Sequence, residues 1–292
     1  MQPLVSILIP VYNHAQYIEE CLNAIPGLSY PNIEVLICDD GSKDSSYIIA
    51  ENWVKRNPQI RAKLFSQENQ GVCKTLNRLI SESSGQYITL CASDDVLAKD
   101  GIAQRVKLLE ADSTKLACIG DATVINEHSV VTAQSAMKTL YSASYDLLQT
   151  DIVRELVLRW SVVGPTLLIR KSAYFNLGFY DSDLLVEDRE FFLRLLSKES
   201  LLFYPCSVAA YRIHSNNASR KSYSSRLKIL QQVAISNLKH YQSFNGFLRF
   251  FLMSHKVDML FFRLPPLPAF VCTLPWRLFR KMLVKVWLRA GL

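Results

Sequence analysis

The feature that most constrains the fold of this chain is the alternation of short apolar runs with amphipathic stretches over its first 120 residues. The pattern predicts strands at 5–9, 33–38, 62–66 and 87–91, and helices at 14–24, 44–56 and 72–83. Apolar strands that are separated by helices indicate a parallel sheet covered on both faces. We therefore expect an α/β fold whose ligand binds beyond the carboxyl ends of the strands.

The alternation loosens after residue 120. Apolar runs predict strands at 163–169 and 207–213, and helical periodicity predicts helices at 187–196 and 224–241. The last helix is longer than the others, and we expect it to leave the main body of the fold.

Two adjacent carboxylates end the fourth predicted strand, where "YITLCASDDVL" places Asp94 and Asp95. Like charges side by side repel each other, and a bound cation removes that repulsion. Mg²⁺ and Mn²⁺ prefer oxygen ligands and are typically held by one or two carboxylates together with substrate phosphates. The pair therefore predicts a divalent-metal site. The alternative is that Asp95 only caps the turn while Asp94 is solvated.

A second acidic pair, Asp39 and Asp40, follows the second predicted strand in "ICDDGSKDSS". The next residues form a turn, and Asp44 or Ser45 is placed to cap the following helix. A turn and a cap do not by themselves explain two aspartates. A carboxylate at this edge could accept hydrogen bonds from a nucleobase imide or a ribose hydroxyl.

Two more segments place polar side chains near the same edge. In "IPVYN", Pro10 cannot extend the ladder, Tyr12 could stack on a base, and Asn13 can cap the first helix. In "NQGVCKTLNRLI", Lys74 and Arg78 lie four residues apart on one helix face. These two cations could meet a diphosphate, or they could simply face solvent.

The segment "LLVEDREFFLRLL" begins a predicted helix with Glu187 and Asp188. Asp188 shares a helix face with Phe192 and Leu195, so its carboxylate is directed toward the apolar side. An inward carboxylate of this kind could be a general base with a raised pKa. Acids in a first helical turn also favour the helix dipole, which accounts for Glu187 without any catalytic role.

The segment "YRIHSNNAS" ends a predicted strand with Arg212 and His214 on one face. His214 could ligate a metal or contact a phosphate, although a lone histidine at a strand end is usually structural. The other four histidines, at positions 14, 128, 240 and 255, suggest no site.

Several reaction classes lose support because their motifs do not occur. No GxGxxG follows a strand, and the chain contains neither GxxxxGK[ST] nor GxSxG. Hydride transfer, P-loop chemistry and serine hydrolysis are therefore disfavoured.

Seven motifs in this order resemble those of the family 2 glycosyltransferases, over about residues 3–219. "VSILIPVYNHAQYIEECL" resembles the opening strand and helix, "IEVLICDDGSKDSS" the nucleotide-binding turn, "NQGVCKTLNRLI" the Asn-x-Gly helix, and "GQYITLCASDDVL" the DxD region. "GPTLLIRKSAYFNLGFYD", "VEDREFFLRL" and "YRIHSNNAS" resemble the acceptor-side half. The resemblance implies the GT-A fold, with a mostly parallel central sheet, a Rossmann-like nucleotide-sugar half and an acceptor half.

The resemblance also implies roles for individual residues. The residues implied to bind the nucleotide-sugar are Pro10, Tyr12, Asn13, Asp39, Asp40, Lys74 and Asp94. The residues implied to hold the metal are Asp94, Asp95 and His214. Asp188 would be the catalytic base, supported by Glu187. The sequence departs from the family at Ala92, where many members carry a further aspartate.

The expected activity is metal-dependent transfer of a sugar, with inversion, from a UDP- or dTDP-sugar to a hydroxyl of a glycan or lipid-linked acceptor. Mn²⁺ or Mg²⁺ is the expected cofactor, and synthesis of a cell-surface polysaccharide or lipopolysaccharide is the expected context. One alternative is a binding-only or weakly active relative, as Ala92 would allow. Another is a nucleotidyltransferase of related architecture, although "PVYNHAQ" replaces the glycine-rich basic loop of those enzymes.

The charge distribution divides the chain into a glycosyltransferase domain at 1–220 and a basic, aromatic-rich helical tail at 221–292. Residues 220–292 hold 13 Lys and Arg residues and a single acid, Asp258. In 277–289, five cations share a predicted helix with Leu, Phe, Met, Val and Trp, the profile of a helix lying on an anionic leaflet. The alternative is an ordinary helix packed on the domain. Nucleic acid is not expected, because the aromatics do not alternate with the cations.

The remaining features favour the cytoplasmic face of the cell membrane, with peripheral attachment. The N-terminal residues do not read as a signal peptide, and no uncharged apolar run reaches the roughly 20 residues that span a bilayer. The seven cysteines are scattered and form no CxxC, which favours reduced thiols.

Overall fold

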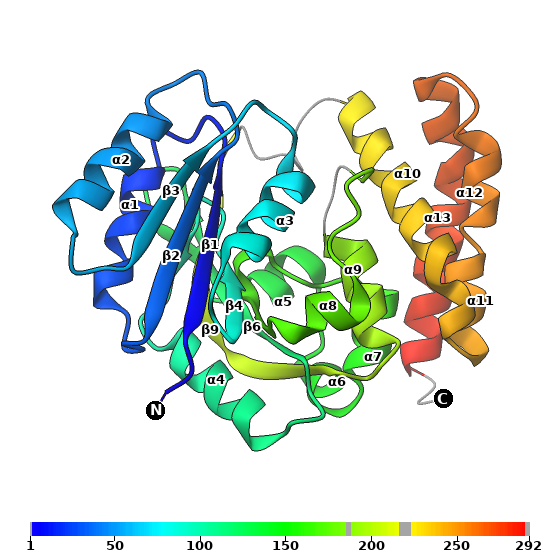
Figure 1. Ribbon diagram of the computed structural model, residues 1–292. Coiled ribbons are helices and arrows are strands. Elements are labelled where there is room, and N and C mark those ends of the chain that lie inside the picture. Colours follow the sequence, from blue (N-terminus) through cyan, green and yellow to red (C-terminus); the bar gives the residue numbers. More distant parts are fainter. Residues whose placement is uncertain (1, 185–187, 216–222, 290–292) are drawn as a thin grey trace.

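The computed structural model describes residues 2–184, 188–215 and 223–289. Within this part of the chain, nine strands form one sheet in the order β3-β2-β1-β4-β8-β6-β9-β5, with β7 paired to β6. Helices cover the sheet, and a group of C-terminal helices stands at one side of it (Figure 1). The architecture is of the expected α/β class.

The strands are β1 (Val5–Val11), β2 (Ile33–Asp39), β3 (Ala62–Ser66), β4 (Tyr87–Leu90), β5 (Val96–Leu97), β6 (Ala117–Asn126), β7 (Val131–Ala133), β8 (Leu167–Arg170) and β9 (Leu201–Ile213). The helices of the body are α1 (Ile18–Asn23), α2 (Ser46–Arg56), α3 (Val72–Glu82), α4 (Gly101–Ala111), α5 (Ala136–Tyr141), α6 (Tyr145–Thr150), α7 (Ile152–Leu158), α8 (Ser172–Leu177) and α9 (Asp188–Leu196). The C-terminal helices are α10 (Tyr223–His240), α11 (Gly246–Met253), α12 (Lys256–Phe261) and α13 (Pro266–Arg289).

The first four strands of the sheet order are parallel, as the alternating pattern predicts. Strand β1 pairs with β2 from Val5–Ile33 to Val11–Asp39, and with β4 on its other side. Helices α1 and α2 lie on one face of these strands and α3 on the opposite face (Figure 1). Ile7 and Trp53 are fully buried, so the apolar strand residues and the inner face of α2 make one core. The carboxyl ends of β1 and β2 therefore meet at one edge.

The second half of the sheet is mixed rather than parallel. Strand β8 is antiparallel to both β4 and β6, whereas β9 is parallel to β6 and antiparallel to β5. Strand β9 also begins six residues before the predicted 207–213. Its ladder with β6 is interrupted between Phe203 and Ser207, because Pro205 has no N–H to donate. The apolar pattern along the chain is also interrupted there, which is why the prediction began only at residue 207.

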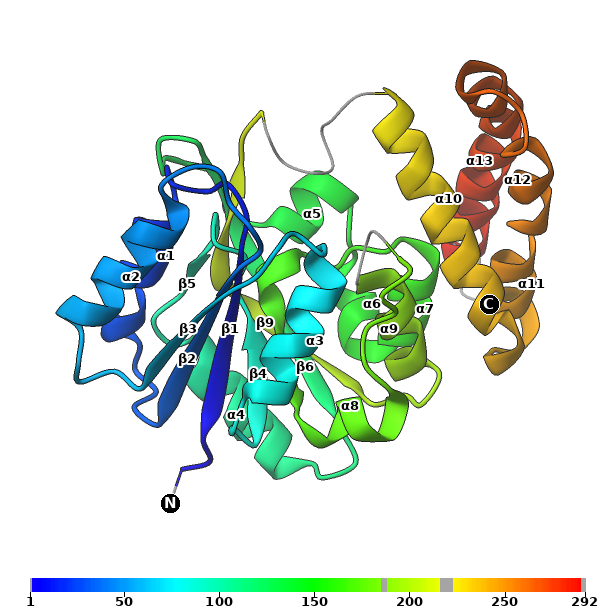
Figure 2. The same ribbon diagram turned by 45° about the horizontal axis from the view of Figure 1, so that its top comes forward.

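The C-terminal helices pack on the body, in contrast to the expected departure of the helix at 224–241 (Figure 2). The Arg189 guanidinium of α9 donates to Asn237 Oδ1 of α10 at 2.9 Å. Arg154 of α7 donates to the Trp287 carbonyl of α13 at 3.0 Å and lies over the Trp287 ring. These contacts cover polar and apolar surface that a departing helix would leave in water. Of the helices described, none combines the length and the apolar character needed to cross a bilayer.

Candidate active site

The loops that follow β1 and β2 are joined by hydrogen bonds at the carboxyl edge of the parallel strands. The Asp40 N–H donates to the Val11 carbonyl at 2.8 Å. Asn13 has a φ of 55°, which asparagine tolerates, and its Oδ1 accepts a 2.7 Å hydrogen bond from the Lys43 N–H. Asn13 therefore holds the turn after β2 and does not cap the first helix, which begins later, at Ile18.

Asp39 and Asp40 are both buried at this edge but have different partners. Asp40 accepts hydrogen bonds from Gln67 Nε2, the Gln70 N–H and the Gly71 N–H, at 2.8 to 2.9 Å. Asp39 Oδ2 accepts from the Ser42 N–H at 3.0 Å, while its Oδ1 has no hydrogen-bond partner among the described residues. Asp39 thus keeps an acceptor for an external donor, and Asp40 shapes the loop that leads into α3.

The other residues expected at the nucleotide side differ in exposure. Tyr12 is 46% exposed, so its ring is open to a stacking partner, and Pro10 is partly buried beside it in the chain. Lys74 is exposed in the first turn of α3. Arg78, by contrast, donates to Gln67 Oε1 at 2.9 Å and lies over the Phe65 ring, so it stabilises β3 and its following loop.

Asp94 lies between two imidazoles. His214 Nε2 is 3.0 Å from Asp94 Oδ2, and His14 Nδ1 is 3.8 Å from Asp94 Oδ1. His14 Nδ1 is also 2.8 Å from Ser93 Oγ. One ligand atom from each of the three residues lies within 4.8 Å of the others, so the set could hold a metal ion.

This cluster differs from the metal set expected from the sequence. His14 belongs to it, although its position in the chain gave no signal beyond its place just after "IPVYN". Asp95 instead turns toward β9, where its Oδ1 accepts the Arg212 N–H at 2.8 Å. Burial, with the neighbouring Asp94 charge adding to it, raises the pKa of Asp95 well above its ordinary value.

Arg212 fixes the segment that carries both aspartates. Its side chain is fully buried, and its Nε donates to the Asp94 carbonyl at 2.7 Å while Nη2 meets Glu20 Oε2 at 2.7 Å. The guanidinium also lies over the Tyr17 ring, which is itself 4.8 Å from the His214 ring. Arg212 therefore has a structural role, because it holds the Asp94–Asp95 segment and α1 against the end of β9.

Asp188 is the first residue of α9, and the chain that leads to it is anchored near the same edge. The Cys73 thiol, in the first turn of α3 beside Lys74, donates to the Leu184 carbonyl at 3.1 Å. Four residues span at most about 14 Å, so Asp188 lies within that distance of Leu184, which contacts α3. Glu187, expected to support Asp188, lies outside the described residues.

The environment of Asp188 agrees with the inward direction expected from its helix position. The residue as a whole is partly exposed, but its carboxyl group is surrounded by protein, and this burial raises its pKa. The adjacent Arg189 and the start of the helix act in the opposite direction without cancelling the effect. Tyr141, at the end of α5, has a pKa raised by burial and then by the Asp188 charge.

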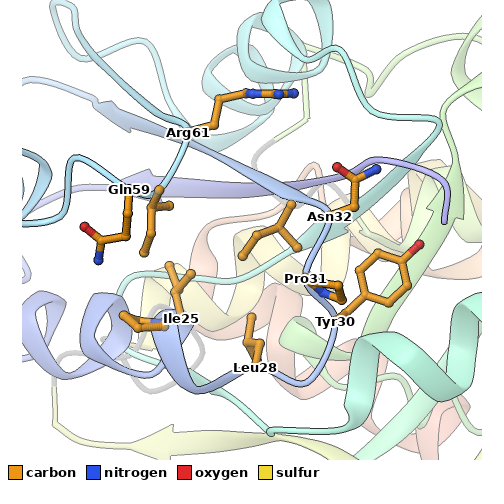
Figure 3. Close-up of a pocket in the computed structure, with 10 residues that line it drawn as sticks. Ile25, Leu28, Tyr30, Pro31, Asn32, Gln59 and Arg61 are labelled. Carbon is orange, nitrogen blue, oxygen red and sulfur yellow. The ribbon is translucent and has the colours of Figure 1, made fainter. Parts of the chain in front are cut away.

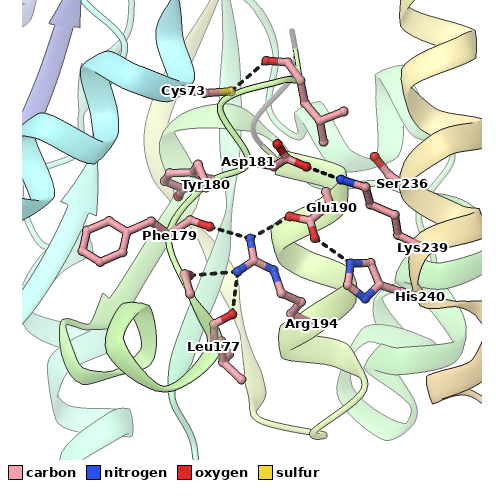
Figure 4. Close-up of polar contacts among 12 residues, drawn as sticks. Cys73, Leu177, Phe179, Tyr180, Asp181, Glu190, Arg194, Ser236, Lys239 and His240 are labelled. Atoms are coloured by element: carbon pink, nitrogen blue, oxygen red, sulfur yellow. Dashed lines mark hydrogen bonds and ion pairs between the residues drawn. The ribbon is translucent and has the colours of Figure 1, made fainter.

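Figure 4 shows how α9 is held against its neighbours. The Arg194 guanidinium donates to the carbonyls of Leu177 and Phe179 and to Glu190 Oε2. Glu190 Oε1 is 2.6 Å from His240 Nε2 of α10. This network fixes α9, and hence Asp188, between the body and the C-terminal helices.

A separate pocket of about 450 Å³ lies away from these residues (Figure 3). It is lined by Ile25, Leu28, Tyr30, Asn32 and Arg61, among others. Asn32 and Arg61 directly precede β2 and β3, so the pocket lies at the amino ends of the parallel strands. It is therefore not part of the carboxylate and imidazole edge.

Comparison with known proteins identifies the family of the chain. Residues 6–156 match the model of the family "Glycosyl transferase family 2". The chain is 26% identical over 241 residues to an uncharacterized glycosyltransferase of Haemophilus influenzae, covering 82% of this chain and 74% of that protein. It is 28% identical over 225 residues to an uncharacterized glycosyltransferase of Rickettsia bellii, covering 75% of this chain but 31% of that protein. The chain thus spans about a third of some relatives.

Solved structures show the same fold. The mannosyltransferase PcManGT of Pyrobaculum calidifontis, in complex with GDP-Man and Mn²⁺, matches with a TM-score of 0.66 at 18% identity, over 100% of this chain and 80% of that one. S. aureus TarS 1-349, in complex with UDP-GlcNAc, matches with a TM-score of 0.64 at 17% identity, over 87% and 71%. With its family match over residues 6–156, this chain belongs to glycosyl transferase family 2 and is a glycosyltransferase with the GT-A fold.

Proposed function

We propose that this chain transfers a sugar from a UDP- or dTDP-sugar to a hydroxyl of a glycan or lipid-linked acceptor, with inversion and with a divalent metal. The observation that supports this function most directly is the Asp94 carboxylate between His14 and His214, at the edge where Asp39 keeps a buried acceptor oxygen. We place the reaction in the synthesis of a surface polysaccharide or lipopolysaccharide, at the cytoplasmic face of the membrane.

The acceptor capacity of Asp39 supports a uracil or thymine base. These bases present one imide N–H, and Asp39 has one oxygen without a described partner, because the other accepts the Ser42 N–H. Guanine would offer two adjacent donors to this carboxylate and would leave one of them unmatched. The neighbour TarS was solved with UDP-GlcNAc, whereas the mannosyltransferase was solved with GDP-Man. We also propose that Tyr12, which is 46% exposed, stacks on the base and that the exposed Lys74 meets the diphosphate.

The donor set at Asp94 supports Mn²⁺ over Mg²⁺. Two imidazoles and one carboxylate suit a transition metal, whereas Mg²⁺ favours oxygen ligands throughout. A metal held by these residues would supply positive charge to the departing diphosphate. The mannosyltransferase neighbour was solved with Mn²⁺.

Asp188 is the proposed base. Its buried carboxylate would take the proton of the acceptor hydroxyl as the oxygen attacks the anomeric carbon and the bond to the diphosphate breaks. One displacement inverts the anomeric centre, and retention would need a second nucleophile.

Ala92 keeps a second possibility open, in which the chain binds the nucleotide-sugar but turns it over slowly. Ala92 offers no carboxylate, so the protein supplies the metal one acidic group, Asp94, within the described cluster. Turnover measurements separate this possibility from the enzyme.

The test is a thermal shift with UDP-sugars in Mn²⁺ or EDTA, combined with transfer of labelled sugar. Ligand near a hundred times its Kd should stabilise the protein by about 2.7 kcal/mol, and EDTA should remove most of this gain. The His214→Ala variant should lose the Mn²⁺ effect, while His128→Ala, at an exposed histidine, should keep it. An equal shift in EDTA, or an unaffected His214→Ala, would contradict the metal assignment. Binding without turnover would favour the binding-only relative.

A further inference from the structure

Helix α13 packs on its neighbours through one face and leaves the opposite face uncovered. Ala269, Thr273, Arg280 and Val284 are buried and recur on one side of the helix. Arg280 contacts Asp258 of α12, and α13 runs between α10 and α12 in both views (Figures 1 and 2). An ordinary surface helix would carry polar residues on its outer side.

The outer side of α13 is apolar instead. The exposed residues of the α13 stripe are Leu267, Val271, Leu274, Leu278 and Met282, between 41% and 65% exposed. At 100° per residue they fall within about 80° of arc, and they extend over about 22 Å of the helix. Monomeric proteins seldom expose a continuous apolar stripe of this kind without a partner.

The charged groups of the helix are sorted between the two sides. Arg280 points inward and donates to Asp258 Oδ2 at 2.5 Å, and Arg277 lies over the Phe270 ring. Lys281 and Lys285 are exposed and share the outer side with the α13 stripe. Two of the five cations counted in the sequence are therefore engaged within the protein, and two flank the apolar surface.

The charge of the tail identifies the class of partner. Asp258, the one acid in residues 220–292, is buried against Arg280, so the surface of the tail is cationic and apolar. Such a surface matches the headgroup region of an anionic lipid leaflet, where apolar side chains enter the acyl boundary and lysines meet phosphates. A second copy of the chain would instead bring its own lysines against these.

We propose that the α13 stripe, with Lys281 and Lys285, docks on an anionic lipid leaflet and lies in its interface without crossing it. This surface would hold the protein at the membrane face proposed above, and its docking does not depend on the proposed reaction. Helix α13 begins at the end of the molecule toward which the parallel strands point (Figure 1). Docking would therefore hold the active site near lipid-linked acceptors.

The test uses the full chain, because Phe251 and Leu252 of α11 and Val284 of α13 belong to the common core, and removal of the tail would uncover the body residues packed against them. Flotation compares vesicles of phosphatidylcholine alone with vesicles that also contain phosphatidylglycerol. The variant Leu274→Glu/Leu278→Glu changes two exposed positions of the stripe. Its control, Ile48→Glu/Val130→Glu, makes the same charge change at exposed apolar residues elsewhere.

The wild type and the control should float with the anionic vesicles, and the stripe variant should bind about tenfold less. Both variants should keep the wild-type thermal stability and UDP-sugar hydrolysis in solution. Equal binding of the stripe variant, or no binding by the wild type, would overturn the proposal. If the wild type forms a dimer and does not bind vesicles, and the stripe variant is monomeric, the surface is an interface with a second copy of the chain. If the wild type floats with the anionic vesicles but does not hydrolyse UDP-sugar, the result contradicts the proposed glycosyl transfer and leaves the docking surface supported.

Discussion

The two acidic pairs at the sheet edge share one arrangement. In each pair, one carboxylate is held by backbone amides of distant segments, Asp40 by Gln70 and Gly71 and Asp95 by Arg212. Its neighbour has an oxygen without a described partner, as in Asp39, or lies beside two imidazoles, as in Asp94. The arrangement explains how two like charges are tolerated at a strand end. In the second pair, which lies in a turn, the pairing of β5 with β9 brings Asp95 to the Arg212 N–H, so its partner differs from those of Asp94.

The Asp39 and Asp40 pair gives a prediction with an internal control. Asp39→Asn must turn its oxygen to the Ser42 N–H, which places an NH₂ group against the base imide. We expect UDP affinity to fall about tenfold or more, with the fold retained. Asp40→Asn would set an NH₂ group against one of three donors and should lower the free energy of unfolding by about 1–3 kcal/mol. Calorimetric titration and urea unfolding measure the two effects. If Asp40→Asn lowered UDP affinity and Asp39→Asn lowered the free energy of unfolding, Asp40 would be the nucleotide-binding residue and Asp39 the structural one.

At the scale of elements, α9 joins the proposed catalytic base to the packing of the body. Its first residue is Asp188, and its later residues Glu190 and Arg194 bind the segment before it and α10. Of the three residues that the pattern placed on one face, Phe192 and Leu195 are buried and Asp188 is partly exposed, but α9 is buried on its other sides as well, so the face is not distinguished by burial. The anchors of Arg194 could not be predicted, since they are backbone carbonyls with no sequence signature.

The raised pKa of Asp188 predicts the pH profile of the enzyme. The proposed base must be deprotonated to act, so kcat/KM should fall as pH decreases through a pKa above the ordinary value of about 3.9. Asp188→Asn should lower kcat by about 10²–10⁴-fold with an unchanged circular dichroism spectrum. Steady-state kinetics over a pH series measures both. Wild-type turnover by Asp188→Asn would remove the residue from the mechanism.

At the scale of the whole molecule, the tail and the glycosyltransferase body form one packed unit. Arg189 is central to this contact: it is buried, and it donates to the Leu156 and Val157 carbonyls as well as to Asn237. Burial lowers its pKa to about 9. The proposed boundary at residue 220 therefore separates regions of different charge rather than units that fold apart.

Removal of Arg189 should weaken both parts together. Arg189→Met leaves three buried acceptors without their donor, and we expect a loss of about 3 kcal/mol in the free energy of unfolding. Arg56→Met, at an exposed ion pair with Glu19, is the control and should change little. Urea unfolding followed by tryptophan fluorescence gives the comparison. An unchanged midpoint for Arg189→Met would show that the tail is not coupled to the body in this way.

The sequence by itself determined the parallel half of the sheet and the strand ends at which Asp39, Asp40, Asp94 and Asp95 stand, because periodicity and strand breaks are local properties. Only the tertiary structure decided which carboxylate of each pair faces the site. That choice depends on partners distant in the chain, such as Arg212 for Asp95, 117 residues away. Likewise His214 reaches Asp94 because β5, which follows the two aspartates, pairs with β9, and His14 meets the same carboxylate from the end of β1. The inward turn of Arg280, which leaves leucines outside, was decided by a buried partner, Asp258, that no helical pattern reveals.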